Sequence, residues 1–337
     1  MRPGNFMTTG IGSLPYTDPK EAVDFVLAHV DVPFWPQLPR RGFLENIYAQ
    51  FSEMMPCAAV NSAAGTMWMD TKADNAAAMV SVLNAYMEGS SARFQISPDH
   101  AASLPEFLGR RHSLSRFPFI KGQVTGPISF GLQVCDQGKR PVLYDDMAFD
   151  AAVKTLALKA KWQAEKLAGA NRNAILFVDE PFLSAMGSAY VHVESARVVE
   201  CLDEVFSLIP CLKAVHCCGN TDWPLIMRTR ADIISLDAYN YGESFILYAK
   251  EIKAFLERGG IISWGIIPAS KDALKESAAS LSSRLDALMR KLSSKGISME
   301  TIRERSMLTP SCGTGSLDVA TSERIFELLG EVAGGMR

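Results

Sequence analysis

Short apolar segments alternate along this chain with longer segments of helical periodicity. The apolar segments have the length of strands rather than helices, and Gly or Pro flanks most of them. Several are apolar throughout, as expected for strands covered on both faces of a sheet. Eight such segments are present, at residues 6–14, 31–38, 117–126, 173–181, 212–220, 231–239, 260–268 and 306–313.

The intervening segments repeat apolar residues about every 3.6 positions, the period of an α-helix. Asp18-Pro19 is typical of a helix N-cap followed by proline in the first turn, and it predicts a helix over 17–30. Alternating strands and helices imply parallel strands with right-handed crossovers, and eight units predict a closed (β/α)8 TIM barrel of the α/β class. Further helices are predicted at 147–169, 191–208, 244–258, 270–295 and 320–334.

Residues 39–116 separate the second and third predicted strands by far more than one crossover helix needs. This stretch contains predicted helices at 43–54 and 74–87, with an Ala-, Gly- and Met-rich part at 58–70 between them. We interpret it as a helical insertion over one end of the barrel, so that residues 1–337 form a single domain.

The composition excludes several classes of partner. Charged residues make up 21% of the chain and the net charge is −3, which gives no nucleic-acid footprint and no basic membrane patch. No uncharged apolar segment reaches transmembrane length, and the first residues lack the apolar core of a signal peptide. The seven cysteines form no short-spaced framework, so reduced thiols and a cytoplasmic location are expected.

Two predicted strands, LKAVHCCGN and SMLTPSCG, carry cysteines near their ends. Side chains two residues apart on a strand share a face, so His216 and Cys218 point the same way and Cys217 points away. With Cys312 they make a soft three-ligand set that favours zinc and leaves a position for a substrate, as in catalytic zinc sites. The alternative is that these are buried packing cysteines, which are common.

Other reactive groups fall at strand ends, where TIM barrels place their chemistry. At least one of the two carboxylates Asp179 and Glu180 is expected to face the pocket and suit an ammonium group, and the alternative for one of them is an ion pair with an arginine at the barrel rim. Ser13 and nearby backbone amides suit a carboxylate. Asp237 is either a fourth zinc ligand, an acceptor that holds His216, or a cap for the following loop. Together these residues predict a pocket for an amino acid with a thiol.

These residues resemble a known family. The chain is similar to the C-terminal catalytic barrel of cobalamin-independent methionine synthase, and to the wider group of zinc methyltransferase barrels related to uroporphyrinogen decarboxylase. The similar segments follow the family's order and span nearly the whole chain. They are TTGIGSLPYT (8–17), GQVTGPISF (122–130), FVDEP (177–181), HCCGN (216–220), ADIISLDA (231–238) and TPSCG (310–313).

The resemblance implies roles for the matching positions. His216, Cys218 and Cys312 would be the zinc ligands and the catalytic set, and Asp237 stands where the family usually has a glutamate ligand. Contacts to homocysteine are implied for Ile11, Ser13, Asp179 and Glu45.

Two departures from the family concern the methyl donor. The segment after GPIS reads FGLQV and lacks a family tryptophan that lines the folate side. The segment SWGIIPAS lacks the family's histidine, which donates a proton to the departing folate nitrogen. A cobalt(I) corrinoid that leaves a methyl group needs no proton. The sequence therefore predicts methylcobalamin or a corrinoid protein as donor, as in the short core synthases with a WGxxP segment.

The resulting hypothesis is a zinc-dependent thiol methyltransferase that converts homocysteine to methionine. Three alternatives stay open: the same chemistry on another thiol such as coenzyme M, a metal-free decarboxylase of the tetrapyrrole class, and a non-catalytic protein that binds a thiol or a corrinoid.

Overall fold

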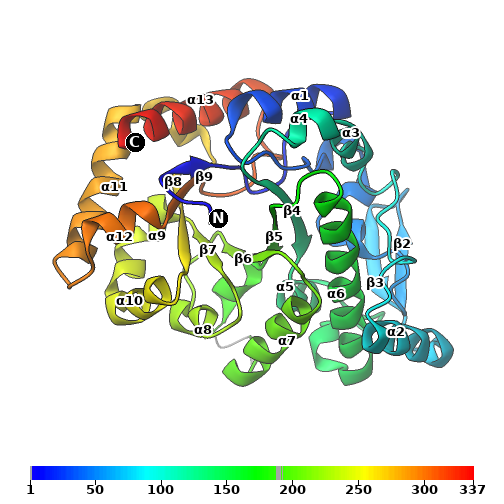
Figure 1. Cartoon of the computed structure of the whole chain (residues 1–337). Helices are drawn as coiled ribbons and strands as arrows, with labels where there is room; N and C mark the ends of the chain where they lie inside the picture. Colours follow the sequence, from blue (N-terminus) through cyan, green and yellow to red (C-terminus); the bar gives the residue numbers. More distant parts are fainter. Residues whose placement is uncertain (1, 187–190, 192) are drawn as a thin grey trace.

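The computed structural model describes residues 2–186, 191 and 193–337. Its main feature is a curled parallel sheet of seven strands in the order β1-β9-β8-β7-β6-β5-β4 (Figure 1). The strands are β1 (Met7–Thr8), β4 (Ile120–Thr125), β5 (Ala174–Asp179), β6 (Leu212–Cys217), β7 (Ile233–Leu236), β8 (Ile261–Ile267) and β9 (Ser306–Pro310). All neighbouring pairs are parallel, which confirms an α/β fold that resembles a TIM barrel.

Helices cover the outside of the sheet (Figure 1). They are α1 (Pro19–His29), α5 (Pro127–Gln133), α6 (Asp146–Ala168), α7 (Ser195–Ser207), α8 (Trp223–Met227), α9 (Ala238–Phe245), α10 (Ala249–Glu257), α11 (Ala278–Ser293), α12 (Met299–Glu304) and α13 (Val319–Met336). The predicted cap of α1 is confirmed, because the Asp18 side chain accepts from the N–H groups of Lys20 and Glu21 and Pro19 is the first helical residue. The helix predicted at 191–208 begins at Ser195, and residue 192 lies outside the described residues.

The second of the eight predicted strands, residues 31–38, is not a regular strand. It makes only isolated parallel bridges, from Phe34 to Lys121 of β4 and from Gln37 to Ser13. Single backbone hydrogen bonds extend these bridges, including Gln37 N–H to the Gly12 carbonyl at 2.9 Å. The segment therefore lies between the two edge strands of the sheet without a continuous ladder.

Proline explains the interrupted ladder. Pro33 and Pro36 have no N–H to donate, so two hydrogen bonds are lost from this segment. Buried side chains replace them: Gln123 Nε2 donates to the Trp35 carbonyl at 2.9 Å, and Trp35 Nε1 donates to Gln163 Oε1 at 2.7 Å. Glutamine side chains thus hold the segment where the strand ladder does not.

The inside of the curled sheet has two levels. Near the amino ends of the strands lies an apolar cluster of Val32, Phe119, Ile175, Phe177, Ala214, Ile233, Ile261 and Met307. Because side chains alternate along a strand, the next inward positions lie closer to the carboxyl ends. There the register pairs Asp179 with His216, His216 with Ser235, and Ser235 with Ser263. The polar groups of four adjacent strands therefore face inward at one level.

Residues 39–116 form 3-10 turns, a hairpin and three helices. These are η1 (Pro39–Arg41), η2 (Phe43–Glu45), η3 (Ala49–Phe51), β2 (Ala58–Asn61), β3 (Thr66–Met69), α2 (Ala76–Glu88), α3 (Ser103–Gly109) and α4 (Arg111–Leu114). α2 confirms the helix predicted at 74–87, and it packs against α6 (Figure 1). That this stretch is an insertion within one domain stays a prediction.

The prediction of an α-helix at 43–54 is wrong. Two 3-10 turns occupy this range, separated by the extended backbone of Asn46. Glu45 supplies the reason, because its carboxylate accepts from the Leu38 N–H at 3.0 Å and ties the first turn to the preceding segment.

Among the described residues, none of the helices combines the length and apolar character that a membrane crossing requires.

Trp35→Phe is expected to destabilise the fold by about 2 kcal/mol or more, because it leaves Gln163 Oε1 buried without its donor and opens a small cavity. Urea denaturation followed by circular dichroism measures the change. Trp68 of β3 is a matched control, since it is partly exposed; Trp68→Phe should cost less than about 1 kcal/mol. Equal losses in the two variants would contradict the role given to the Trp35–Gln163 bond.

Candidate metal centre and substrate pocket

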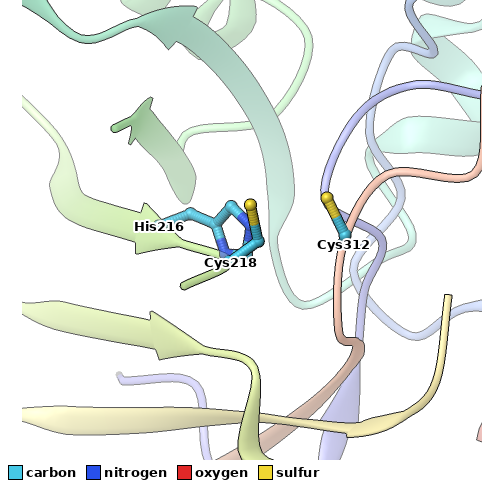
Figure 2. Close-up of side chains that lie close together, drawn as sticks. All are labelled: His216, Cys218 and Cys312. Atoms are coloured by element: carbon cyan, nitrogen blue, oxygen red, sulfur yellow. The ribbon is translucent and has the colours of Figure 1, made fainter. Parts of the chain in front are cut away.

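His216, Cys218 and Cys312 converge at the carboxyl ends of the strands (Figure 2). One potential ligand atom from each residue lies within 4.8 Å of the others. His216 belongs to β6 and Cys218 follows it, whereas Cys312 follows β9, and β7 and β8 lie between these strands in the sheet. The contact is therefore made across the mouth of the curled sheet. Cys217, as its position predicts, is fully buried in the surrounding core.

The His216 imidazole is held in place at one nitrogen and open at the other. Its Nδ1 lies 3.1 Å from Ser235 Oγ, whereas its buried Nε2 has no hydrogen-bond partner among the described residues. A buried polar atom without a partner is costly unless a ligand, water or ion satisfies it. An imidazole nitrogen and two sulfurs are donors that zinc prefers, so the residues present fit this metal.

The two thiols are coupled. The neighbouring Cys312 thiol, as a donor, and the His216 imidazole lower the pKa of Cys218 well below its usual range. The same interaction with Cys218, together with burial, raises the pKa of Cys312. Cys218 is therefore the first of the pair to become a thiolate, the form that binds metals.

Asp237 is not among the residues whose potential ligand atoms lie within 4.8 Å of one another. Its two carboxylate oxygens accept from the backbone N–H of Asn240 at 2.9 Å and from Asn240 Nδ2 at 2.7 Å, and it is the N-cap of α9. Of the roles left open by the sequence, the structure shows the cap.

A cavity of about 290 Å³ adjoins the three residues. Its lining includes all seven of the predicted pocket residues other than Asp237, namely Ile11, Ser13, Glu45, Asp179, His216, Cys218 and Cys312. A larger cavity of about 870 Å³ lies at the amino ends of the strands, beside β1, and contains none of them. We place the site in the smaller cavity because it holds the unpartnered polar atoms and the carboxyl ends of the strands.

Asp179 offers this cavity an unpartnered carboxylate. The residue is 4% exposed, and its buried Oδ1 has no hydrogen-bond partner among the described residues. Burial raises the pKa of Asp179, while the Lys121 ammonium and the His216 imidazole act in the opposite direction. A cationic group in the cavity would therefore stabilise the ionised carboxylate.

Glu180 has a structural role instead. Its carboxylate accepts from the N–H groups of Ile128 at 2.9 Å and Ser129 at 2.7 Å, and from Ser129 Oγ at 2.6 Å. These donors lie at the N-terminus of α5, where a negative charge is favourable. Glu180 therefore does not pair with an arginine, as one alternative predicted. A Cβ at Gly126 would overlap its carboxyl group, which explains the glycine before α5.

Ser13 and Glu45 are already partly engaged. Ser13 Oγ accepts from the Gly315 N–H at 3.2 Å. The buried Glu45 carboxylate accepts from Leu38 N–H at 3.0 Å and pairs with Arg41 at 3.0 Å. Glu45 therefore lines the cavity with part of its hydrogen-bonding capacity used by the protein.

Lys121 was missed by the sequence analysis. It is fully buried inside the sheet, and its Nζ donates to the Ile11 carbonyl at 2.6 Å. The only signal was a single cation within an otherwise uncharged predicted strand, FPFIKGQVTG. A lysine is rarely buried in a core, so its place in an apolar strand could have marked it as a candidate functional residue.

Comparisons with known proteins find solved structures of similar fold but no similar sequence family. No family model matches the sequence, and no curated protein matches it. A B12-independent methionine synthase from Shewanella sp. W3-18-1, solved with selenomethionine, is 19% identical with a TM-score of 0.48, and the match covers 68% of this chain and 65% of that one. A methyltransferase from Methanosarcina mazei is 13% identical with a TM-score of 0.56, and the match covers 96% of this chain and 92% of that one. The second likeness shows a shared fold along nearly the whole chain.

Gly126→Ala is expected to destabilise the protein by about 2 kcal/mol, because the added methyl group displaces Glu180 from the α5 N-terminus. Thermal unfolding measures the effect. Gly330 of α13 is the control, because a Cβ there meets no atom within 4 Å, and Gly330→Ala should be neutral or stabilising. A neutral Gly126→Ala would show that the Glu180 contact is not tight.

Proposed function

We propose that this protein is a zinc-dependent thiol methyltransferase that methylates homocysteine to methionine. The observation that supports it most is the convergence of His216, Cys218 and Cys312 beside an unpartnered carboxylate. The proposal joins this geometry to the sequence resemblance; the structural likenesses support the fold alone.

The three residues would hold the metal through His216 Nε2 and the two sulfurs. Ser235 holds the imidazole through Nδ1, which leaves Nε2 free for a metal ion. A zinc ion held there would lower the pKa of a substrate thiol and keep it ionised at neutral pH. Three protein ligands leave a fourth position for the sulfur of the substrate.

The cavity suits a small amino acid in size and charge. Its volume of about 290 Å³ accepts a molecule of that class. The free oxygen of Asp179 would bind the ammonium group, and the turn at residues 11–13 would bind the carboxylate. Coenzyme M has no ammonium group and would leave Asp179 buried without a partner, so Asp179 favours the amino acid.

We propose methylcobalamin, free or on a corrinoid protein, as the methyl donor. The substrate thiolate would take the methyl group, and the electron pair of the broken bond would remain on cobalt(I), so no acid is required. The segment after β8 agrees with this, because residues 268–270 are Pro-Ala-Ser and offer no histidine. The cavity is too small to enclose a corrin, so the donor would present its methyl group at the mouth.

Cys312→Ser and Cys218→Ala are expected to lose bound zinc and thiol methylation together, since each removes one of three ligands. Metal analysis and a methyl-transfer assay with methylcobalamin and homocysteine measure both, with methyl-folate as the comparison donor. Cys217→Ala is the matched control, because its sulfur faces the core and it should keep the metal. Full activity in a metal-free Cys312→Ser protein would end the proposal and favour a metal-free enzyme.

Asp179→Asn is expected to raise the KM for homocysteine by roughly 10- to 100-fold, because a charged hydrogen bond to the ammonium group is lost. The KM for coenzyme M should change little, since that thiol has no ammonium group. Steady-state assays with both thiols separate the two substrates. The same loss with both thiols would argue that Asp179 acts on the metal centre instead.

A further inference from the structure

Lys121 is a buried cation that the proposed chemistry does not use. Its side chain points inward from β4 and is fully buried. Nζ donates to the Ile11 carbonyl at 2.6 Å and to Gln123 Oε1 at 3.0 Å. It also lies 5.3 Å from the ring centroid of Phe34 and 4.4 Å from that of Phe177. A carbonyl, an amide oxygen and two aromatic faces thus replace the water around the ammonium group.

Such a group is expensive to bury. Burial lowers the pKa of the Lys121 ammonium, and the Asp179 carboxylate opposes that shift. A methionine would fill similar space without the loss of hydration, so packing does not account for a lysine here. A methionine could not donate to the Ile11 carbonyl or to Gln123 Oε1, the two acceptors that the ammonium group holds.

The peptide unit between Ile11 and Gly12 lies in the turn whose residues Ile11 and Ser13 line the cavity. The Ile11 carbonyl and the Gly12 N–H belong to one planar trans peptide, so they point in opposite directions. By holding the carbonyl toward the interior, Lys121 turns the Gly12 N–H the other way. Among the described residues, neither Gly12 N–H nor Ser13 N–H donates a hydrogen bond.

The turn is also restrained from the sides. A Cβ at Gly12 would lie 2.5 Å from Gln37 Oε1 and 3.2 Å from Gln123 Cδ, so the backbone passes closely between these two side chains. Gln123 is itself held by Lys121. One ammonium group thus fixes both the carbonyl before Gly12 and a side chain packed against it.

We propose that Lys121 is a positioning residue for the carboxylate of the substrate: its bond to the Ile11 carbonyl orients the free N–H groups of Gly12 and Ser13 as a carboxylate-binding turn. This inference rests on the proposed function, because it assumes a thiol amino acid in the cavity. It adds the residue that gives this turn its orientation.

Lys159 provides a matched control. It is also fully buried, and its Nζ likewise donates to a backbone carbonyl, that of Gln95, at 3.1 Å. It lies on α6 and does not line the cavity. Lys159→Met therefore removes an equally buried ammonium group without touching residues 11–13.

The experiment compares homocysteine with 3-mercaptopropylamine, which has the same thiol and amine but no carboxylate. Binding to the zinc-loaded protein is measured by calorimetry, and KM and kcat by methyl transfer. Lys121→Met should weaken homocysteine binding and raise its KM by about tenfold or more, with kcat and 3-mercaptopropylamine binding unchanged. Lys159→Met should bind both thiols as the wild type does.

Other outcomes overturn the inference in distinguishable ways. Unchanged homocysteine affinity in Lys121→Met, or equal loss for both thiols, rejects the positioning role and leaves the proposed function standing. Failure of the wild type to bind either thiol rejects the proposed function and the inference with it. If Lys121→Met does not fold, Lys121→Gln, which keeps a donor one bond shorter, should show a partial and selective loss. Failure of both variants to fold would make Lys121 a structural residue only.

Discussion

The structure of the site depends on the register of parallel strands. Because neighbouring strands run the same way without a shift between β5 and β7, Asp179, His216 and Ser235 face the interior at one level. The curl of the sheet then brings Cys312 of the β9 end opposite Cys218. No local sequence signal joins residues 94 positions apart; the closure of the sheet does so, and the register decides which side chains meet.

The inner wall near the carboxyl ends carries polar atoms that the fold leaves without partners. Besides Asp179 Oδ1 and His216 Nε2, the hydroxyl groups of Thr125, Ser263 and Thr309 are buried and unpaired within the described part of the chain. Each such group costs about 1–3 kcal/mol when nothing satisfies it. Apolar residues, as at the other end of the strands, would fold more stably. The polar level is therefore explained by what it binds, including enclosed water, rather than by packing.

Much of this arrangement follows from period and order in the sequence, and the rest does not. The two-residue spacing of His216 and Cys218 predicts their common face, since alternation is a local property of a strand. In segment 31–38 the prolines that interrupt the ladder are local, but the glutamines that hold the segment, Gln123 and Gln163, are distant in sequence. The partners of Asp237 and Glu180 were equally hidden: a carboxylate at a strand end can bind a metal, cap a helix or pair with an arginine, and only the packed neighbours decide.

The adjacent carboxylates Asp179 and Glu180 have different roles: one stabilises the fold around the site, and the other lines the cavity. Alternation sends them to opposite sides of β5, so Glu180 meets the N–H groups of α5 and Asp179 meets the cavity. The Glu180 carboxylate is satisfied by the protein and orients α5, whereas the Asp179 carboxylate is left open for a ligand. A slip of one residue in the pairing of β5 would exchange these roles, leaving the helix uncapped and the cavity without its free oxygen. The tight fit of Gly126 against Glu180 opposes that slip, because only one register places a residue without a side chain beside the carboxyl group. The helix cap thus specifies which carboxylate remains available for chemistry.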